Sequence, residues 1–205
     1  MKNIKLLFIC LGNICRSPAA HAVMEHLVEQ KGLQDTIQID SAGIGDWHKG
    51  QLPDKRMRSC AAERGFSLMH KARHFKGHED IAKFDLILVM DDENYRDVSY
   101  YAQSQEEKEK IHYLAHYLTQ HPEYHIIPDP YYGTSTDFHL VLDLIEDARA
   151  LGAAHVFTFT LAPEFFTSLG FSAVARDTLS PVVWAECSKC PKFYKCDEVG
   201  MMLHF

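Results

Sequence analysis

A cysteine and an arginine separated by five residues carry the strongest chemical signal in this 205-residue chain. Cys10 is followed by Leu-Gly-Asn-Ile-Cys, and then by Arg16 and Ser17. A loop of this length can curl so that the thiol and the guanidinium face one bound oxyanion, with backbone N–H groups lining the ring. The sequence therefore predicts a phosphate-binding loop whose further members are Leu11, Gly12, Asn13, Ile14 and Cys15.

The residue types in this loop suggest a covalent mechanism. A Cys10 thiolate could attack phosphorus and form a phosphocysteine, which water then removes. Arg16 would grip two equatorial oxygens with its planar fork, and Ser17 could hydrogen-bond the thiolate. Gly12 and Asn13 suit positions where the loop needs positive φ or where the backbone comes close to the anion.

A displacement at phosphorus also needs an acid for the leaving oxygen, and Asp129 is the candidate. It lies between Pro128 and Pro130, whose rings restrict the backbone and present the carboxyl from a stiff loop. Asp129 would act as general acid first and general base second. The alternative is an Asp-Pro turn that only caps the following helix.

The elements that must position these residues alternate between strand and helix. Apolar runs and helical spacing predict strands at residues 5–9, 37–39 and 85–90, and helices at 18–30, from near Pro53, from Asp92 and at 134–150. The unbroken apolar run 85–90 is typical of a central parallel strand that is covered on both faces. We expect an open parallel α/β sheet flanked by helices, with the phosphate loop after the first strand, where such sheets bind ligands.

Composition narrows the function classes. The chain is 46% hydrophobic and carries a formal net charge of −7, which argues against general binding to nucleic acid or to an anionic membrane. The stretch before Cys10 is too short for a signal peptide, and no apolar run has the length of a membrane span. We therefore expect a cytoplasmic protein, whose six cysteines are free thiols, catalytic groups or metal ligands rather than a disulfide framework.

Several separated motifs together resemble the low-molecular-weight protein tyrosine phosphatases. They lie at residues 10–18, 41–48, 70–73, 90–91, 129–133 and 141–147. The resemblance covers about residues 5–147 and implies that Cys10 is the nucleophile, Arg16 the phosphate clamp and Asp129 the proton donor. The same roles follow from the residue chemistry alone.

The resemblance also implies a supporting layer and a pocket. Ser41 and His70 would hydrogen-bond Asn13 and hold it in a left-handed conformation, although taken singly they read as a turn residue and a surface histidine. Trp47 and Tyr131 would wall the mouth, with Tyr132 beside them. A deep slot between aromatic rings admits phosphotyrosine and leaves phosphoserine too short to reach the thiolate.

Two further loop positions carry implications from the family. Members resembling protein-arginine phosphatases have Thr where this chain has Ile14, so Ile14 favours aryl phosphate as substrate. Cys15 matches a second loop cysteine that can form a reversible disulfide with the nucleophile and protect it from irreversible oxidation. Tyr131 and Tyr132 match positions that resemble regulatory phosphorylation sites in some animal members.

The chain continues beyond the family pattern, so we predict a phosphatase domain at residues 1–150 and a small α/β extension at 151–205. A strand at 156–160, a helix at 163–171 and the ending from Trp184 to Glu198 resemble the final part of N-acetyltransferases of the N-acetylglutamate synthase type. No Gly-rich pyrophosphate loop precedes Arg149, so we expect a docking or dimerisation element rather than a second activity. Its strands must pair with the phosphatase sheet, with each other or with a second chain, and a homo-oligomer is one expected outcome.

Two groups of potential metal ligands are weaker signals. Cys187, Cys190 and Cys196 have one spacing that is common at zinc sites, but no clear fourth ligand, so free thiols are the favoured interpretation. His112 and His116 are four residues apart and predict one face of a helix without an acidic base. We expect no cofactor, and no metal at the catalytic site.

The function predicted from the sequence is a protein-tyrosine phosphatase acting on a phosphotyrosine-containing protein or a small aryl phosphate. Two alternatives remain at this stage. An arsenate reductase could use the same oxyanion loop, with Cys15 beginning a thiol relay. A binding module would result if the extension covered the pocket.

Overall fold

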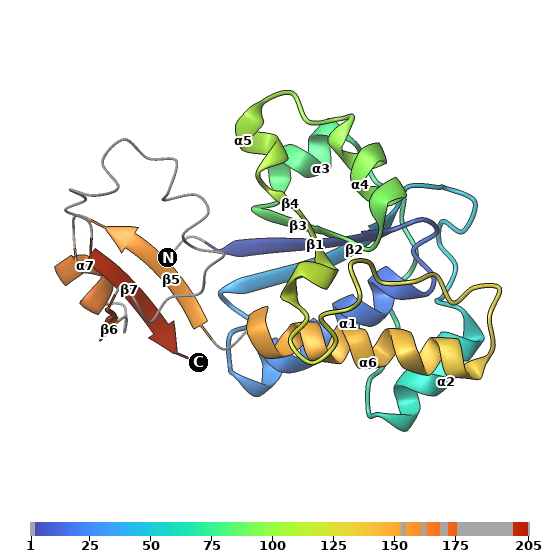
Figure 1. The fold of residues 1–205 in the computed structure, drawn as a ribbon. Helices are drawn as coiled ribbons and strands as arrows, with labels where there is room; N and C mark the ends of the chain where they lie inside the picture. The colour runs from blue at the N-terminus through green and yellow to red at the C-terminus, as the bar shows by residue number, and fades with distance from the viewer. Residues whose placement is uncertain (1–2, 153–154, 161–162, 169–171, 176–198, 205) are drawn as a thin grey trace. The chain divides into compact units, whose positions relative to one another are not determined.

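The computed structural model describes residues 3–152, 155–160, 163–168, 172–175 and 199–204. The chain divides into two compact units, Met1–Leu151 and Gly152–Phe205, and each is described by itself (Figure 1).

The first unit is built on a parallel sheet of four strands in the order β2-β1-β3-β4. The strands are β1 (Ile4–Cys10), β2 (Ile37–Gly43), β3 (Leu86–Val89) and β4 (Ile111–Tyr113). β1 pairs with β2 on one side and with β3 on the other. The predicted open parallel sheet is confirmed, and the short edge strand β4 is an addition that the sequence pattern did not indicate.

Helices cover both faces of this sheet (Figure 1). On one face lie α1 (Arg16–Gln30), α2 (Lys55–Glu63) and α6 (Ser135–Gly152), and on the other lie α3 (His78–Lys83), α4 (Asp92–Ser99) and the short α5 (Gln105–Lys108). Alternate residues of β1 enter two separate cores: Phe8 packs in the α1 and α6 layer, whereas Leu7 and Ile9 pack in the α3 and α4 layer. This period of two places Cys10 on the α1 side of the sheet.

Helix α1 begins at Arg16, two residues before the predicted start at Pro18. Proline is tolerated in a first helical turn because the N–H groups there have no intrahelical partner. Arg16 and Ser17 therefore belong to the first turn of the helix, directly after the loop that starts at Cys10.

Two sequence predictions about local structure are wrong. β2 runs on to Gly43, so Ser41 lies in a strand paired with Phe8 rather than in a turn. His112 lies in β4 and His116 in a 3-10 helix (Leu114–Tyr117), so they do not share a helical face. The pairing of His112 with Leu88 of β3 draws this segment into the sheet, and such tertiary pairing overrides local spacing.

The second unit contains an antiparallel sheet in the order β5-β7-β6. Its strands are β5 (His155–Thr160), β6 (Ser172–Ala173) and β7 (Val199–His204). Helix α7 (Pro163–Ser168) lies within the predicted helix, whose last three residues are outside the described ranges. The strands of the extension were expected to pair with the phosphatase sheet, with each other or with a second chain; the described strands pair with each other. The stretch from Trp184 to Glu198, with Cys187, Cys190 and Cys196, lies entirely outside the described residues.

Within the described ranges, no helix is both long enough and apolar enough to cross a membrane.

Candidate active site

Cys10 lies at the carboxyl end of β1 with only 3% of its surface exposed. Its sulfur accepts a hydrogen bond from the backbone N–H of Asn13 at 3.3 Å and lies 3.0 Å from the Ser17 hydroxyl oxygen. Both groups are placed to stabilise negative charge on the sulfur, as a nucleophilic thiolate requires. The predicted contact between Ser17 and the nucleophile is therefore present.

The loop after Cys10 turns its N–H groups toward the pocket. Three of its carbonyl oxygens are held from outside: Cys10 accepts from the N–H of Ile44 at 3.0 Å, Leu11 from Gly45 at 2.8 Å and Ile14 from Asp54 at 2.8 Å. In a trans peptide the N–H of the next residue points opposite to the carbonyl. The N–H groups of Leu11, Gly12 and Cys15 therefore point away from these outer segments, toward the space that an oxyanion would fill.

The end of β2 approaches this loop so closely that only glycine fits there. A Cβ atom at Gly43 would lie 2.9 Å from the backbone nitrogen of Asn13 and 2.9 Å from the carbonyl carbon of Gly12. Side chains do not tolerate contacts of this length, so Gly43 lets strand and loop pack backbone to backbone.

Asn13 holds the sharpest bend of the loop, with a φ of 55° and a fully buried side chain. Its Nδ2 donates to the hydroxyls of Ser17 and Ser41, both at 2.9 Å, and its Oδ1 accepts from the backbone N–H of Arg73 at 2.9 Å. The predicted Ser41 contact is present, and asparagine tolerates the left-handed region better than most residues. Gly12, in contrast, is not among the positive-φ residues.

The predicted hydrogen bond between His70 and Asn13 is wrong. His70 Nε2 lies 3.2 Å from the backbone carbonyl oxygen of Ser41 instead. Asn13 donates to Ser17 and Ser41 and accepts from Arg73, and His70 supports the loop indirectly, through Ser41. Burial lowers the pKa of His70, and the neighbouring His21 lowers it further.

Arg16 is 2% exposed and is held by three acceptors. Its guanidinium donates to the Asp91 carboxylate, to the carbonyl of Ile127 at 3.1 Å and to Asp129 Oδ2 at 2.7 Å. Burial alone would lower the pKa of Arg16, but the nearby Cys10, Asp129 and Asp91 outweigh it and raise the pKa, so the side chain stays charged.

Asp91 has a structural role that the sequence did not assign. Its Oδ1 accepts from the backbone N–H of Asn94 at 2.8 Å and so caps α4, while its other oxygen orients Arg16. An aspartate directly before a predicted helix start at Asp92 is a typical N-cap signal, but no sequence rule connects that cap with an arginine 75 positions earlier.

Asp129 lines the same cavity as Cys10 and Arg16. Its Oδ1 accepts from the backbone N–H of Tyr131 at 3.1 Å, a local turn that fixes the carboxyl. Helix α6 starts at Ser135, and Asp137 accepts from the N–H of Thr134 there, so Asp129 does not cap this helix.

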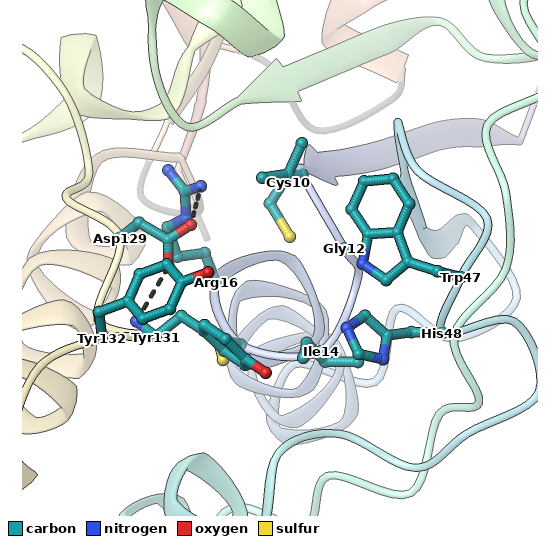
Figure 2. Close-up of a pocket in the computed structure, with 11 residues that line it drawn as sticks. Cys10, Gly12, Ile14, Arg16, Trp47, His48, Asp129, Tyr131 and Tyr132 are labelled. Atoms are coloured by element: carbon teal, nitrogen blue, oxygen red, sulfur yellow. Dashed lines mark hydrogen bonds and ion pairs between the residues drawn. The ribbon is translucent and has the colours of Figure 1, made fainter.

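The cavity above Cys10 has a volume of about 300 Å³. Figure 2 shows Trp47 and His48 on one side of the Cys10 sulfur, and Tyr131 and Tyr132 on the other. The sequence predicted the three aromatic residues here but not His48, whose ring lies against Gly12 and would be 3.1 Å from a Cβ there. Tyr132 is 97% exposed and marks the outer rim.

Arg56 fixes the tyrosine wall. Its guanidinium donates to the carbonyl of Tyr131 at 2.9 Å and lies 5.5 Å from the centre of the Tyr131 ring. Asp54, which caps α2, holds the other side of Arg56 at 2.9 Å. The start of α2 therefore braces both the phosphate loop, through the Asp54 N–H, and the loop that carries Asp129.

Cys15 is a buried free thiol at the N-cap of α1. Burial raises the pKa of Cys15 well above its ordinary value, and the nearby Cys10, Asp54 and Asp129 raise it further. Cys15 is therefore a neutral thiol at physiological pH. This distinguishes it from a nucleophile, which needs the thiolate form.

Comparisons with known proteins agree with this geometry. A family model described as low molecular weight phosphotyrosine protein phosphatase matches residues 5–155. The low molecular weight phosphotyrosine protein phosphatase of Sus scrofa is 44% identical over 137 residues, which cover 66% of this chain and 85% of that protein.

Solved structures give the same result. A protein tyrosine phosphatase from Entamoeba histolytica with Hepes in the active site has a TM-score of 0.67 at 40% identity, covering 71% of this chain and 92% of that one. YfkJ from Bacillus subtilis has a TM-score of 0.67 at 36% identity, covering 74% and 92%. The chain belongs to the low molecular weight phosphotyrosine protein phosphatase family.

Proposed function

We propose that this protein-tyrosine phosphatase cleaves aryl phosphates, phosphotyrosine foremost, through a phosphocysteine on Cys10. The observation that carries the proposal is the convergence of Cys10, Arg16 and Asp129 on one cavity, although they come from a strand end, a helix start and a distant loop. A nucleophile, a bidentate cation and a carboxyl acid are the parts that such a displacement needs.

In the first step the Cys10 thiolate attacks phosphorus while the loop N–H groups and Arg16 hold the equatorial oxygens. Asp129 donates its proton to the leaving phenoxide oxygen as the P–O bond breaks. An incoming phosphate would replace Asp129 in the Arg16 fork, since the two compete for the same N–H group. In the second step Asp129 takes a proton from water, which attacks phosphorus and releases the Cys10 thiolate beside Ser17.

The pocket walls support an aromatic substrate. Trp47 and Tyr131 offer flat apolar surfaces on either side of the path to Cys10, where the ring of a phosphotyrosine could lie. A phosphoserine has no ring to fill this space and its shorter side chain would leave the phosphorus away from the sulfur. Ile14, which also lines the cavity, is consistent with the same preference.

Hydrolysis of para-nitrophenyl phosphate by the full chain tests the mechanism. Cys10→Ser should abolish turnover, and Asp129→Asn should lower kcat by about 10²- to 10⁴-fold, the usual contribution of a positioned acid or base. Cys60→Ala is the matched control, because Cys60 is also a buried free thiol but does not line the cavity. Turnover that survives Cys10→Ser would refute the mechanism.

The same assay decides between the alternatives. An arsenate reductase would consume a thiol reductant with arsenate and hydrolyse the aryl phosphate poorly. A binding module covered by the extension would be inactive as the full chain and active after removal of residues 151–205. Equal turnover by the full chain and the shortened chain would show that the extension does not affect the pocket.

We also propose that Cys15 protects the nucleophile. Peroxide would oxidise Cys10 to a sulfenic acid, and the Cys15 thiol would condense with it, forming a disulfide and releasing water. The buried, neutral thiol of Cys15 supports this order of events, since the thiolate is the form that peroxide attacks first. The free thiols Cys10, Cys15 and Cys60 are consistent with the reducing cytoplasm that we expect as the location.

A further inference from the structure

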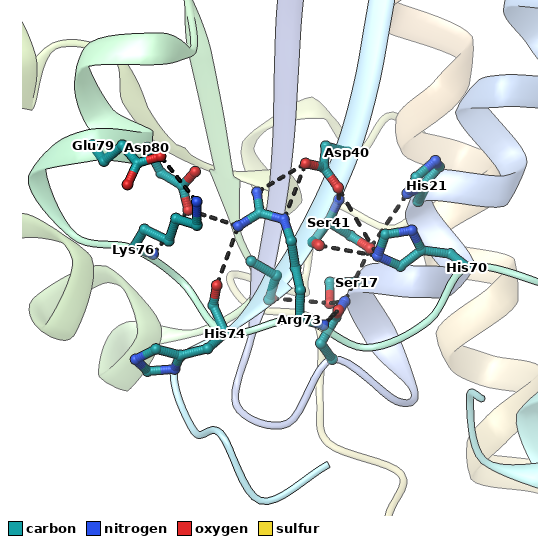
Figure 3. Close-up of polar contacts among 12 residues, drawn as sticks. Ser17, His21, Asp40, Ser41, His70, Arg73, His74, Lys76, Glu79 and Asp80 are labelled. Carbon is teal, nitrogen blue, oxygen red and sulfur yellow. Dashed lines mark hydrogen bonds and ion pairs between the residues drawn. The ribbon is translucent and has the colours of Figure 1, made fainter. Parts of the chain in front are cut away.

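Two histidines and an aspartate form a cluster behind the phosphate loop, outside the catalytic cavity. His21 comes from α1, Asp40 from β2 and His70 from the segment after α2 (Figure 3). Each offers one potential ligand atom, and these three atoms lie within 4.8 Å of one another. The rings of His21 and His70 are 4.7 Å apart between centroids, tilted by 45°.

A cation would replace or share existing hydrogen bonds of the cluster. Asp40 Oδ2 accepts from the Arg73 guanidinium at 2.9 Å, while its Oδ1 accepts from the backbone N–H of Ser41 at 2.8 Å and lies 3.9 Å from His70 Nε2. His70 Nε2 lies 3.2 Å from the Ser41 carbonyl oxygen, so binding a metal there requires the neutral ring to carry its proton on Nδ1 instead, while Asp40 Oδ1 keeps a lone pair for the metal. Neutral imidazole is the form that binds metal ions, and an ordinary imidazole is mostly neutral at pH 7.

The local charge also favours a cation. Glu25 lies next to the cluster, with Oε1 3.1 Å from His21 Nε2, and its side chain is 55% exposed. The Arg73 guanidinium forms ion pairs with both Asp40 and Asp80, and its distance to Asp80 Oδ2 is 2.8 Å. Three carboxylates against one guanidinium leave a negative balance around the two imidazoles.

We propose that His21, Asp40 and His70 bind a divalent transition metal ion, with Zn²⁺ the best match. Two imidazoles and one carboxylate form a ligand set that zinc commonly takes, with a fourth position for Glu25 or water. Metal–ligand bonds of about 2 Å place tetrahedral ligand atoms roughly 3.3 Å apart. The three atoms would therefore need to close by about 1.5 Å at most, a shift that side-chain rotation can supply because the side chains of Asp40 and His70 are 26% and 24% exposed.

The position of this site gives it a consequence for the loop. Ser41 links the two: its Oγ accepts from Asn13 Nδ2 at 2.9 Å and lies 3.3 Å from His21 Nδ1. A metal bound by His21 and His70 would fix the rings on both sides of Ser41. It would thereby clamp the residue that holds the left-handed turn at Asn13, and raise the thermal stability of the folded chain.

Titration of the metal-stripped full chain with Co²⁺ and Zn²⁺ tests the proposal. The variants are His21→Gln and His70→Gln, and the matched control is His74→Gln, an exposed histidine on the same segment as His70. The wild type and the control should bind one equivalent of metal that the two variants do not bind. If the variants still bind it, their affinity should be at least about tenfold lower, the usual effect of losing a ligand or its support. Zn²⁺ should raise the Tm of the wild type and the control more than that of either variant.

Thiols elsewhere in the chain, including Cys10, could also bind these metals, and Co²⁺ separates the two cases. Thiolate ligands add an intense near-ultraviolet charge-transfer band that imidazole and carboxylate ligands lack. The histidine-dependent equivalent should show only weak visible bands. Equal metal content in the wild type and both variants, or a histidine-dependent equivalent with the thiolate band, would overturn the proposal. Because His70 is partly exposed, His70→Gln keeps the test decisive even where His21→Gln misfolds.

Discussion

Asn13 provides the sharpest test of how the phosphate loop is held. Replacing Asn13 with Ala removes two buried hydrogen bonds, to Ser17 and Ser41, and a partly buried one from the backbone N–H of Arg73. At about 1 kcal/mol for each bond, the loss is roughly 3 kcal/mol. An alanine at φ 55° adds about 1 kcal/mol of strain, because Cβ crowds the carbonyl in the left-handed region. The free energy of unfolding should therefore fall by about 4 kcal/mol.

Asn13→Gly separates the two contributions. Glycine enters the left-handed region without strain but cannot restore the hydrogen bonds, so this variant should be about 1 kcal/mol more stable than Asn13→Ala. Both variants should lose about 10²-fold in kcat/KM, since loop N–H groups that are no longer fixed cannot be preorganised for the transition state.

The measurements are urea unfolding of the full chain followed by circular dichroism, and steady-state hydrolysis of para-nitrophenyl phosphate. Asn94→Ala is the control: Asn94 is also buried, at 1% exposure, but its Oδ1 has no hydrogen-bond partner among the described residues. It should change stability by less than about 1 kcal/mol and leave kcat/KM unaltered. If Asn13→Gly had wild-type activity, the backbone conformation alone would hold the loop and the tethering argument would be wrong.

Four further predictions address other parts of the chain. Peroxide should inactivate the wild type and a thiol should restore it, whereas Cys15→Ser should stay inactive after the same treatment; unchanged recovery in the variant would exclude the protective disulfide. Asp147→Asn should lower the free energy of unfolding by about 2–4 kcal/mol, because the buried carboxylate accepts from three successive backbone N–H groups and a hydroxyl. The control Asp143→Asn, on the exposed side of α6, should lower it by less than about 1 kcal/mol. Stability should fall as pH drops below about 6.5, since the lowered pKa of folded His70 makes the unfolded chain the better proton acceptor, and His70→Gln should flatten this slope in urea midpoints. In light scattering, the full protein should have a mass larger than that of one chain, and a chain ending near Ala150 should be a monomer. If both are monomers, association through the extension is ruled out.

The part of the site that could be predicted from sequence is the part built from local chemistry. Residues 10–17 are contiguous, follow an apolar strand and precede a helix, so their types and spacing already define an oxyanion loop. Asp129 was identifiable because two prolines single it out and because the proposed displacement needs an acid.

The supports of the loop could not be derived in this way. Asp91 is recognisable as a helix cap, but its contact with Arg16 depends on β1 and β3 being neighbours in the sheet. The family resemblance assigned His70 as a partner of Asn13, but His70 contacts the Ser41 carbonyl instead, and the backbone N–H of Arg73 donates to Asn13 Oδ1. Such contacts depend on which strands pair, and hydrophobic patterning specifies the strands better than it specifies their neighbours.

Strand β2 links the supports of the loop to the proposed metal cluster. Its register with β1 sets Ser41 beside Phe8 and Gly43 beside Cys10, so the last three residues of this edge strand run directly behind the nucleophile. Gly43 admits the loop backbone and Ser41 holds Asn13, while Asp40, one residue earlier, holds Arg73 and faces His70. On its outer side, among the described residues, β2 has backbone pairing only at its end, where Gly43 bridges to His74, so side chains must fix the rest of that side. The Asp40–Arg73–Asp80 ion pairs supply that restraint, and a metal ion between His21, Asp40 and His70 would add to it at the point nearest the loop.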